Sequence, residues 1–254
     1  MRVVAIVNQK GGVGKTTTSA NLCHAIAEMG KKVTVIDLDP QGHLAVSLGI
    51  RDAKQDGIDA VMLGEKTLEQ VVLTVRPNLQ LIVSGPKLMQ IEQLNSSSPH
   101  RGDMLKTALA SGLTEQDYIF IDCPPSSGLL VVNALFAADE LLIPMTSDFM
   151  ALQGLSHLMG TVKKFEKSLT KQFKLWLVIS RYTPNRKISK QVLNLLLQHF
   201  PNTILATVIK ETNVLAECPS FGKTVLEYSP GSRSALDFQK LATDFIQGKV
   251  MYGK

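Results

Sequence analysis

The feature that most constrains this chain is a glycine-rich turn close to its amino end. Residues 10–16 read KGGVGKT and directly follow a short run of β-branched residues at 2–8. Three glycines within the turn allow the backbone to fold around an anion, so that its amide hydrogens converge on a phosphate group. A helix-like stretch at 16–29 comes next, and its positive end would face the same phosphate. The sequence therefore predicts a strand, a phosphate-binding turn and a helix in succession.

Short apolar runs alternate with helix-like stretches along the rest of the chain. Runs typical of buried strands lie at 2–8, 32–37, 79–83, 118–121, 140–144, 175–179 and 203–208, helices are expected at 151–165 and 190–200, and NSSSP at 95–99 reads as a surface loop. Strands without polar alternation, separated by helices, predict an α/β fold in three layers, a mostly parallel twisted sheet with helices on both faces. No repeat or linker interrupts the pattern, so we expect one domain over residues 1–254.

Composition excludes several classes of protein. With 44% hydrophobic and 19% charged residues, the chain is expected to be globular rather than disordered. No uncharged apolar run reaches the ~18 residues that a membrane-spanning helix needs, and the first residues lack a secretory signal. Three scattered cysteines, Cys23, Cys123 and Cys218, form neither a disulfide framework nor a metal knuckle. The expected compartment is the cytoplasm.

The residues that close the glycine turn have defined uses in a phosphate site. Lys15 would bridge the β- and γ-phosphates, the Thr16 hydroxyl would bind Mg²⁺, and Thr17 would bond the α-phosphate. The full set expected to bind ATP is Lys10, Gly11, Gly12, Val13, Gly14, Lys15, Thr16 and Thr17.

Acidic residues stand at the predicted carboxyl ends of two more strands. Asp37 and Asp39 follow the run at 32–37, and Asp122 follows the run at 118–121. Ligands of parallel α/β sheets bind beyond these ends, so the acids should meet the glycine turn in one crevice. Asp122 fits the Walker B arrangement, in which an acid holds Mg²⁺ through its water shell. A capping or turn aspartate is the structural alternative for each residue.

These motifs resemble those of the ParA/MinD group of P-loop ATPases, and most of all the short Soj-type ParA proteins that move chromosomes and plasmids. The turn lacks the first glycine of the general motif G-x-x-x-x-G-K-[ST], and Lys10 is the extra lysine of the group's deviant Walker A sequence. The matching segments are NQKGGVGKTTTSANL, VIDLDPQGHLAVSLG, IDCPPSSGLL and CPSFGKTVLEYSPGSRSALDFQKLA. The resemblance covers nearly the whole chain and implies the P-loop NTPase fold.

The resemblance also implies roles for single residues. Lys10 would reach across an ATP-sandwich dimer to the nucleotide of the other subunit, where a second cation stabilises the transition state. Asp39 would position the attacking water, with Asp37 as its support, and would bind Mg²⁺ through water. The implied catalytic residues are Lys10, Lys15 and Asp39.

Two segments match the switch regions that sense the γ-phosphate in this group. They are residues 41–49 and 124–132, in which Gly42 and Gly128 are expected to give backbone freedom. Such loops order on ATP and relax after hydrolysis, so that a partner can read the nucleotide state.

Positive charge is concentrated in the second half of the chain. Residues 1–127 carry a net charge of −1 and residues 128–254 one of +6, and the stretch 163–190 has nine basic residues against one acid. This is more one-sided than a solvated helix face needs, and a polyanion partner explains it. The resemblance implies DNA binding without sequence preference, and the residues expected to contribute are Arg186, Lys187, Lys190, Lys223 and Arg233.

One stretch departs from the family pattern. Where Soj-type proteins commonly read Pro-Arg-Asn-x-Arg, residues 210–214 read KETNV, so a usual basic DNA contact is absent and Glu211 opposes phosphate. Lys210, Lys223 or Arg233 would have to compensate.

The resemblance implies a weak ATPase that forms a homodimer with ATP, binds nucleoid DNA and is stimulated by a ParB-like or cargo-adaptor protein. Positioning of another cargo by the same cycle stays open. A MinD-like membrane switch needs a cationic amphipathic helix at the carboxyl end, where Asp237 and Asp244 oppose anionic lipid. We expect a helix packed on the sheet there and no stable membrane association. A redox protein like the nitrogenase iron protein would need cluster cysteines, and Cys123 and Cys218 have no such motif.

Overall fold

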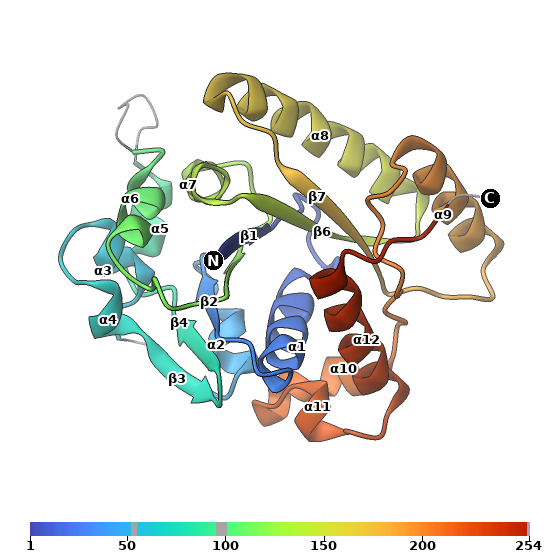
Figure 1. Cartoon of the computed structure of the whole chain (residues 1–254), viewed down its shortest axis with the longest axis horizontal. Helices are drawn as coiled ribbons and strands as arrows, with labels where there is room; N and C mark the ends of the chain where they lie inside the picture. Colours follow the sequence, from blue (N-terminus) through green and yellow to red (C-terminus); the bar gives the residue numbers. More distant parts are fainter. Residues whose placement is uncertain (52–54, 95–100, 253–254) are drawn as a thin grey trace.

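The apolar runs form a seven-stranded sheet (Figure 1) in a computed structural model, which describes residues 1–51, 55–94 and 101–252. The strands are β1 (Arg2–Ile6), β2 (Val33–Asp37), β3 (Leu73–Arg76), β4 (Leu79–Ile82), β5 (Tyr118–Asp122), β6 (Glu140–Thr146) and β7 (Lys174–Ser180). They lie in the order β3-β4-β2-β5-β1-β6-β7, and every neighbouring pair is parallel except β3 and β4. The expected mostly parallel sheet is confirmed.

The central strands are covered on both faces. Every residue of β2 and β5 is buried, and so is every residue of β1 after Arg2. Burial on both sides requires apolar residues at odd and even positions alike, which is why these strands read as continuous apolar runs without alternation.

One face of the sheet is covered by elements from the two ends of the chain, which lie below the sheet in Figure 1. They are α1 (Lys15–Glu28), α2 (His43–Ser47), α10 (Asn213–Glu217), η1 (Cys218–Phe221), α11 (Val225–Tyr228) and α12 (Arg233–Gln247). Phe245 of α12 packs between Phe120 and Trp176, with ring centroids 5.6 and 5.8 Å away. The apolar face of this last helix therefore belongs to the core, as expected for a helix packed on the sheet.

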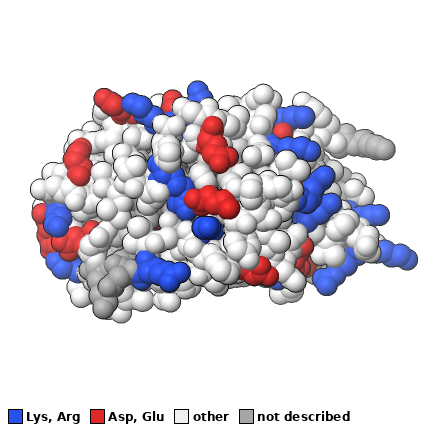
Figure 2. Space-filling view, turned by 90° about the horizontal axis from the view of Figure 1, so that it is seen from below, with Lys and Arg blue, Asp and Glu red and all other residues white. Residues whose placement is uncertain are grey.

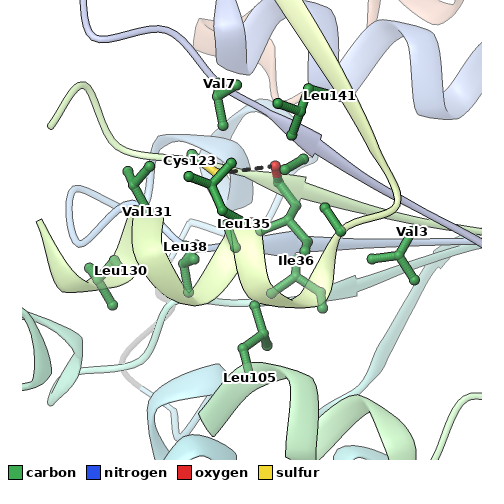
Figure 3. Close-up of a cluster of buried hydrophobic side chains, with 14 of the residues drawn as sticks. Val3, Val7, Ile36, Leu38, Leu105, Cys123, Leu130, Val131, Leu135 and Leu141 are labelled. Carbon is green, nitrogen blue, oxygen red and sulfur yellow. Dashed lines mark hydrogen bonds between the residues drawn. The ribbon is translucent and has the colours of Figure 1, made fainter. Parts of the chain in front are cut away.

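The other face is covered by elements from the middle of the chain. They are α3 (Ile58–Met62), α4 (Leu68–Val71), α5 (Leu88–Glu92), α6 (Met104–Ala110), α7 (Leu129–Ala137), α8 (Phe149–Leu169) and α9 (Lys187–His199). Leu130, Val131 and Leu135 of α7 and Leu105 of α6 belong to the same buried cluster as Val3 and Ile36 of the strands (Figure 3). Helices on both faces of the sheet give the three layers that the sequence predicted.

The predicted helices are present with small shifts of their ends. The stretches 16–29, 151–165 and 190–200 correspond to α1, α8 and α9. None of the helices in the described part of the chain is long and apolar enough to cross a membrane. The loop expected at 95–99 falls outside the described residues.

Two expectations about the sheet were wrong. Residues 203–208 form no strand. The Leu205 amide donates to Leu177 of β7, but the next amide that donates to β7 is that of Ile209, to Ile179, instead of the residue 207 that a regular parallel strand would use. Conversely, β3 was not expected. It is a half-exposed edge strand that folds back on β4 through Asn78, whose φ is 59°, so it lacks the continuous apolar run of a buried strand.

Candidate functional site

The carboxyl ends of three adjacent strands bring the expected residues together. Asp122 at the end of β5 is the register partner of Ile6 on β1 and of Asp37 on β2. The chain leaves β1 into the glycine turn and enters α1 at Lys15. The lysine and both aspartates thus meet at one edge of the sheet, as predicted.

The glycine turn takes a backbone conformation that other residues adopt with strain. Gly12 and Gly14 have φ angles of 72° and 85°. Gly14 is also the N-cap of α1 and supplies no side-chain bond to it. The first amides of a helix have no partner within the helix and carry partial positive charge, so this end of α1 suits an anion.

Lys15 lies inside the site although it is charged. It is 7% exposed, and its ammonium lies 3.4 Å from the Lys10 carbonyl oxygen. Burial lowers the pKa of Lys15, an effect that the carboxylates of Asp122 and Asp39 partly oppose. A phosphate group beside this ammonium would restore the favourable environment that burial removes.

Asp122 has one oxygen without a hydrogen-bond partner among the described residues. Its Oδ1 accepts from the Ser19 hydroxyl at 2.8 Å, whereas the buried Oδ2 accepts from no donor. Burial raises the pKa of Asp122 to about 6. A hydrated divalent cation beside Thr16 would supply the missing partner, so these residues fit magnesium. No group of three or more His, Cys, Asp or Glu in the described part of the chain could hold a metal ion.

Asp37 fastens the segment that follows β2. Its oxygens accept from the amides of Asp39 at 3.1 Å and Leu44 at 3.2 Å. Burial and the nearby Asp122 raise the pKa of Asp37 well above its ordinary range. Asp39, which accepts from the Gln41 amide at 3.0 Å, is half-buried and faces the site. Gly42, whose amide donates to the Asp39 carbonyl oxygen at 3.0 Å, has a φ of 66°, a conformation that glycine adopts readily.

The second expected switch, residues 124–132, is held by a residue that the sequence did not reveal. Glu92 of α5 accepts from the Ser126 hydroxyl at 3.1 Å and from the Leu130 amide at 2.8 Å. Gly128 has an ordinary φ of −81°, so its expected backbone freedom is not used. A Cβ at this position would lie 2.0 Å from Glu92 Oε1, so any other residue would displace the Glu92 carboxylate.

Lys10 forms an ion pair within its own chain. Its ammonium lies 3.1 and 3.0 Å from the two carboxylate oxygens of Asp148, the N-cap of α8. Desolvation raises the pKa of Asp148, but hydrogen bonds from Thr146 and Lys10 outweigh it, so the net shift is downward. Asp148 was not predicted, although an acid after a strand and before a helix is a signal for a cap.

The residues expected to bind DNA do not form one patch. Arg186, Lys187 and Lys190 lie exposed at the start of α9. Lys223 is exposed after η1, and Arg233, which begins α12, pairs with Asp237 at 2.9 Å. Figure 2 shows Lys and Arg gathered toward the end of the molecule at which α9 lies in Figure 1, while the rest of this face carries both signs.

The basic stretch 163–190 is divided by β7. Lys174 begins this strand and Arg181 follows its end, so the lysines of α8 and the cations of α9 lie near opposite ends of a strand of roughly 20 Å. The continuous run in the sequence is therefore not a continuous surface.

A strand leads into a glycine turn that opens a helix, a lysine lies in the first turn of that helix, and an acid ends the neighbouring strand. This arrangement defines a P-loop nucleotide-binding protein. The sequence model of the AAA domain family matches residues 1–175. The chain is 37% identical over 246 residues to the sporulation initiation inhibitor protein Soj of Bacillus subtilis, which is 96% of this chain and 97% of that protein. It belongs to the ParA/MinD family of P-loop ATPases and is Soj-like.

A second curated relative and two solved structures are also similar to the chain over nearly its whole length. The chain is 37% identical over 253 residues to the chromosome partitioning protein ParA of Caulobacter vibrioides, covering 97% of this chain and 94% of that protein. Cobyrinic acid a,c-diamide synthase from Mycobacterium smegmatis, solved with a bound ATP analog and magnesium, has a TM-score of 0.83 at 28% identity and covers 100% and 99% of the two chains. Apo McdA from Cyanothece has a TM-score of 0.85 at 23% identity over 96% and 99%, a likeness of fold.

Proposed function

We propose that this chain is a ParA-like ATPase that dimerises with ATP and Mg²⁺, binds double-stranded DNA without sequence preference, and acts with a ParB-like partner in chromosome or plasmid partition. The observation that carries the proposal is the buried edge of the sheet, where Lys15 and the unpartnered oxygen of Asp122 lie beside the glycine turn. Full-length similarity to Soj and ParA proteins supports the partition role.

Each group of the site has a use in binding nucleotide. Lys10 to Thr17 would surround the phosphates, with Lys15 on the β- and γ-phosphates. Magnesium would neutralise phosphate charge, held by the Thr16 hydroxyl and, through water, by Asp122 and Asp39. The solved relative with an ATP analog and magnesium supports this combination of ligands.

Hydrolysis would need both subunits. Asp39 would position the attacking water, and Lys10 would exchange Asp148 for the nucleotide of the other subunit. The Lys10–Asp148 pair is partly exposed, with side chains 39% and 46% accessible, so breaking it costs no more than about 1 kcal/mol. A site completed only in the dimer explains why we expect a slow basal rate, raised by a ParB-like or cargo-adaptor protein.

DNA binding would use the exposed cations of the second half of the chain. Arg186, Lys187 and Lys190 form the densest group, and Lys223 and Arg233 lie on separate elements. Two copies of a moderately basic surface would sum their phosphate contacts, so that only the ATP-bound dimer binds tightly. DNA binding of this kind would place the protein on the nucleoid.

The experiment is co-sedimentation of the protein with plasmid DNA in the presence of ATP, ADP or no nucleotide. We expect retention with ATP alone, and ATP turnover that rises when DNA and the ParB-like partner are both added. Equal DNA binding with all three additions would contradict a nucleotide-controlled dimer.

A membrane-associated role is tested by flotation with anionic vesicles and ATP. The apolar residues of α12 that would insert into lipid, such as Leu241 and Phe245, are fully buried in the core. We therefore expect the protein to stay with the DNA and not with the vesicles.

A further inference from the structure

Two side chains at the end of β7 hold the outer side of the glycine turn. The Ser180 hydroxyl donates to the Val13 carbonyl oxygen at 2.6 Å, and Arg181 Nη1 donates to the Gly12 carbonyl oxygen at 3.0 Å. The turn also packs directly on them, because a Cβ at Gly14 would lie 3.8 Å from Ser180 Cβ. Neither residue belongs to the Walker motifs.

These two hydrogen bonds orient two peptide groups. In a planar trans peptide the C=O and the next N–H point in opposite directions. Because the carbonyls of Gly12 and Val13 point toward the end of β7, the amides of Val13 and Gly14 must point away from it, into the turn. Amides aligned before a ligand arrives form an anion-binding concavity without reorganisation on binding.

Arg181 is itself held in place. Its Nε and Nη2 both donate to Glu211 Oε1, at 3.0 and 2.5 Å, so one guanidinium spans Glu211 and the Gly12 carbonyl. Residues 209–211 run beside 181–182, since the Tyr182 amide donates to the Ile209 carbonyl at 2.9 Å.

The backbone of Arg181 has a strained conformation. Its φ is 50°, in the left-handed region that is unfavourable for a residue with a side chain. An exposed arginine would not need this conformation if it only faced solvent, whereas here the conformation directs the guanidinium onto the turn.

We propose that Ser180 and Arg181, the latter oriented by Glu211, are positioning residues that preorganise the glycine turn for the diphosphate of a nucleotide. The inference rests on the proposed nucleotide binding and adds residues from the opposite half of the chain to that site. Because these amides would bind the phosphates equally before and during hydrolysis, the pair sets nucleotide affinity and not the rate of the chemical step.

The experiment measures the dissociation constant of Mg-ADP by calorimetry, and KM and kcat for ATP, in the wild type, Ser180→Ala, Arg181→Ala and Arg181→Lys. Removing either hydrogen bond should weaken ADP about tenfold and raise KM by a similar factor, with kcat unchanged. Arg181→Lys should recover part of the affinity, because an ammonium can donate to the Gly12 carbonyl but cannot fork onto Glu211 as well.

Two further variants complete the design. Lys240→Ala removes an exposed positive charge from α12 and should leave ADP affinity unchanged. Glu211→Gln keeps the shape of the side chain, weakens its hold on Arg181 and should lower ADP affinity about threefold. Thermal melts show whether each variant is folded, and if Ser180→Ala is not, the exposed Arg181 and Glu211 variants carry the test.

Wild-type affinity in Arg181→Ala and Ser180→Ala, or an equal loss in Lys240→Ala, would overturn the inference. A fall in kcat with KM unchanged would overturn it as well. If the wild type itself binds no ADP, the proposed function fails instead, so the two failures are distinguishable.

Discussion

The edge of the sheet beside the glycine turn and the basic surface at the start of α9 differ in how far their charged residues are buried. Lys15, Asp37 and Asp122 are at most 7% exposed. Burial lowers the pKa of Lys15 and raises the pKa of Asp37, and the charge of Asp122 opposes the first shift and adds to the second. Arg186 and Lys187 are exposed at the start of α9. A buried charge that loses its partner costs several kcal/mol, while an exposed one is worth about 1 kcal/mol or less. Single changes should therefore abolish function at the first region, and at the second only summed changes should matter.

The largest effect is expected from Lys15→Ala. The variant loses two charge-assisted contacts to phosphate and leaves Asp122 without its cation, so ATP and ADP should bind at least ~100-fold more weakly. Calorimetric titration measures the loss, and Lys32→Ala, an exposed lysine paired with Glu115, is the matched control. Tight ADP binding by Lys15→Ala would show that the buried lysine does not contact phosphate.

Asp39→Ala should separate binding from chemistry within the same region. We expect ATP-dependent dimers to form while turnover falls about 100-fold or more, because the attacking water is no longer positioned. Size-exclusion chromatography with ATP and phosphate release measure the two effects. Asp56→Ala, which removes a surface aspartate paired with Lys66, should change neither. Normal turnover in Asp39→Ala would remove that residue from its proposed role.

At the basic surface, Arg186→Ala combined with Lys187→Ala should weaken ATP-dependent DNA binding several-fold and reduce its salt dependence. Each lost phosphate contact lowers the slope of log affinity against log salt by about 0.9. The matched control is Lys163→Ala with Lys164→Ala, two exposed cations of α8 from the same basic stretch. A larger loss in the control pair would place the DNA face on α8.

The smallest effect concerns a contact between the two ends of the chain, His24 of α1 with Thr224. The ring Nδ1 lies 2.6 Å from the Thr224 hydroxyl, and burial, helped by Arg76, lowers the pKa of His24. A lowered pKa means that the unfolded chain takes up the proton first, so stability is fully present above pH ~6.5 and is lost as the pH falls through the lowered value.

Urea unfolding between pH 8 and 5 tests this expectation. The wild type should lose stability below pH 6.5 more steeply than His24→Asn, while at pH 8 the variant should be less stable by about 1 kcal/mol through the weakened hydrogen bond. Parallel pH profiles for the two proteins would contradict a titrating His24.

The features that local chemistry decides were predicted correctly from the sequence. The glycines of the turn, Lys15 at the start of α1 and Asp122 at the end of β5 were placed correctly because each position follows from a short contiguous pattern. The features that depend on packing between distant segments were not predicted correctly. Residues 203–208 have the apolar character of a strand but lose the regular pairing with β7 after Leu205, and Gly128 leaves room for the carboxylate of Glu92, 36 positions earlier in the chain.

By itself, the sequence determined the alternation of strands and helices and the anion-binding turn, because backbone geometry and apolar patterning act over a few neighbouring residues. Only the tertiary structure decided that Asp148 would hold Lys10, that Glu92 would fasten the segment after β5, and that Ser180 and Arg181 would support the turn. These contacts join residues 38 to 169 positions apart, and such pairs meet only when the whole sheet and its two helical layers have packed.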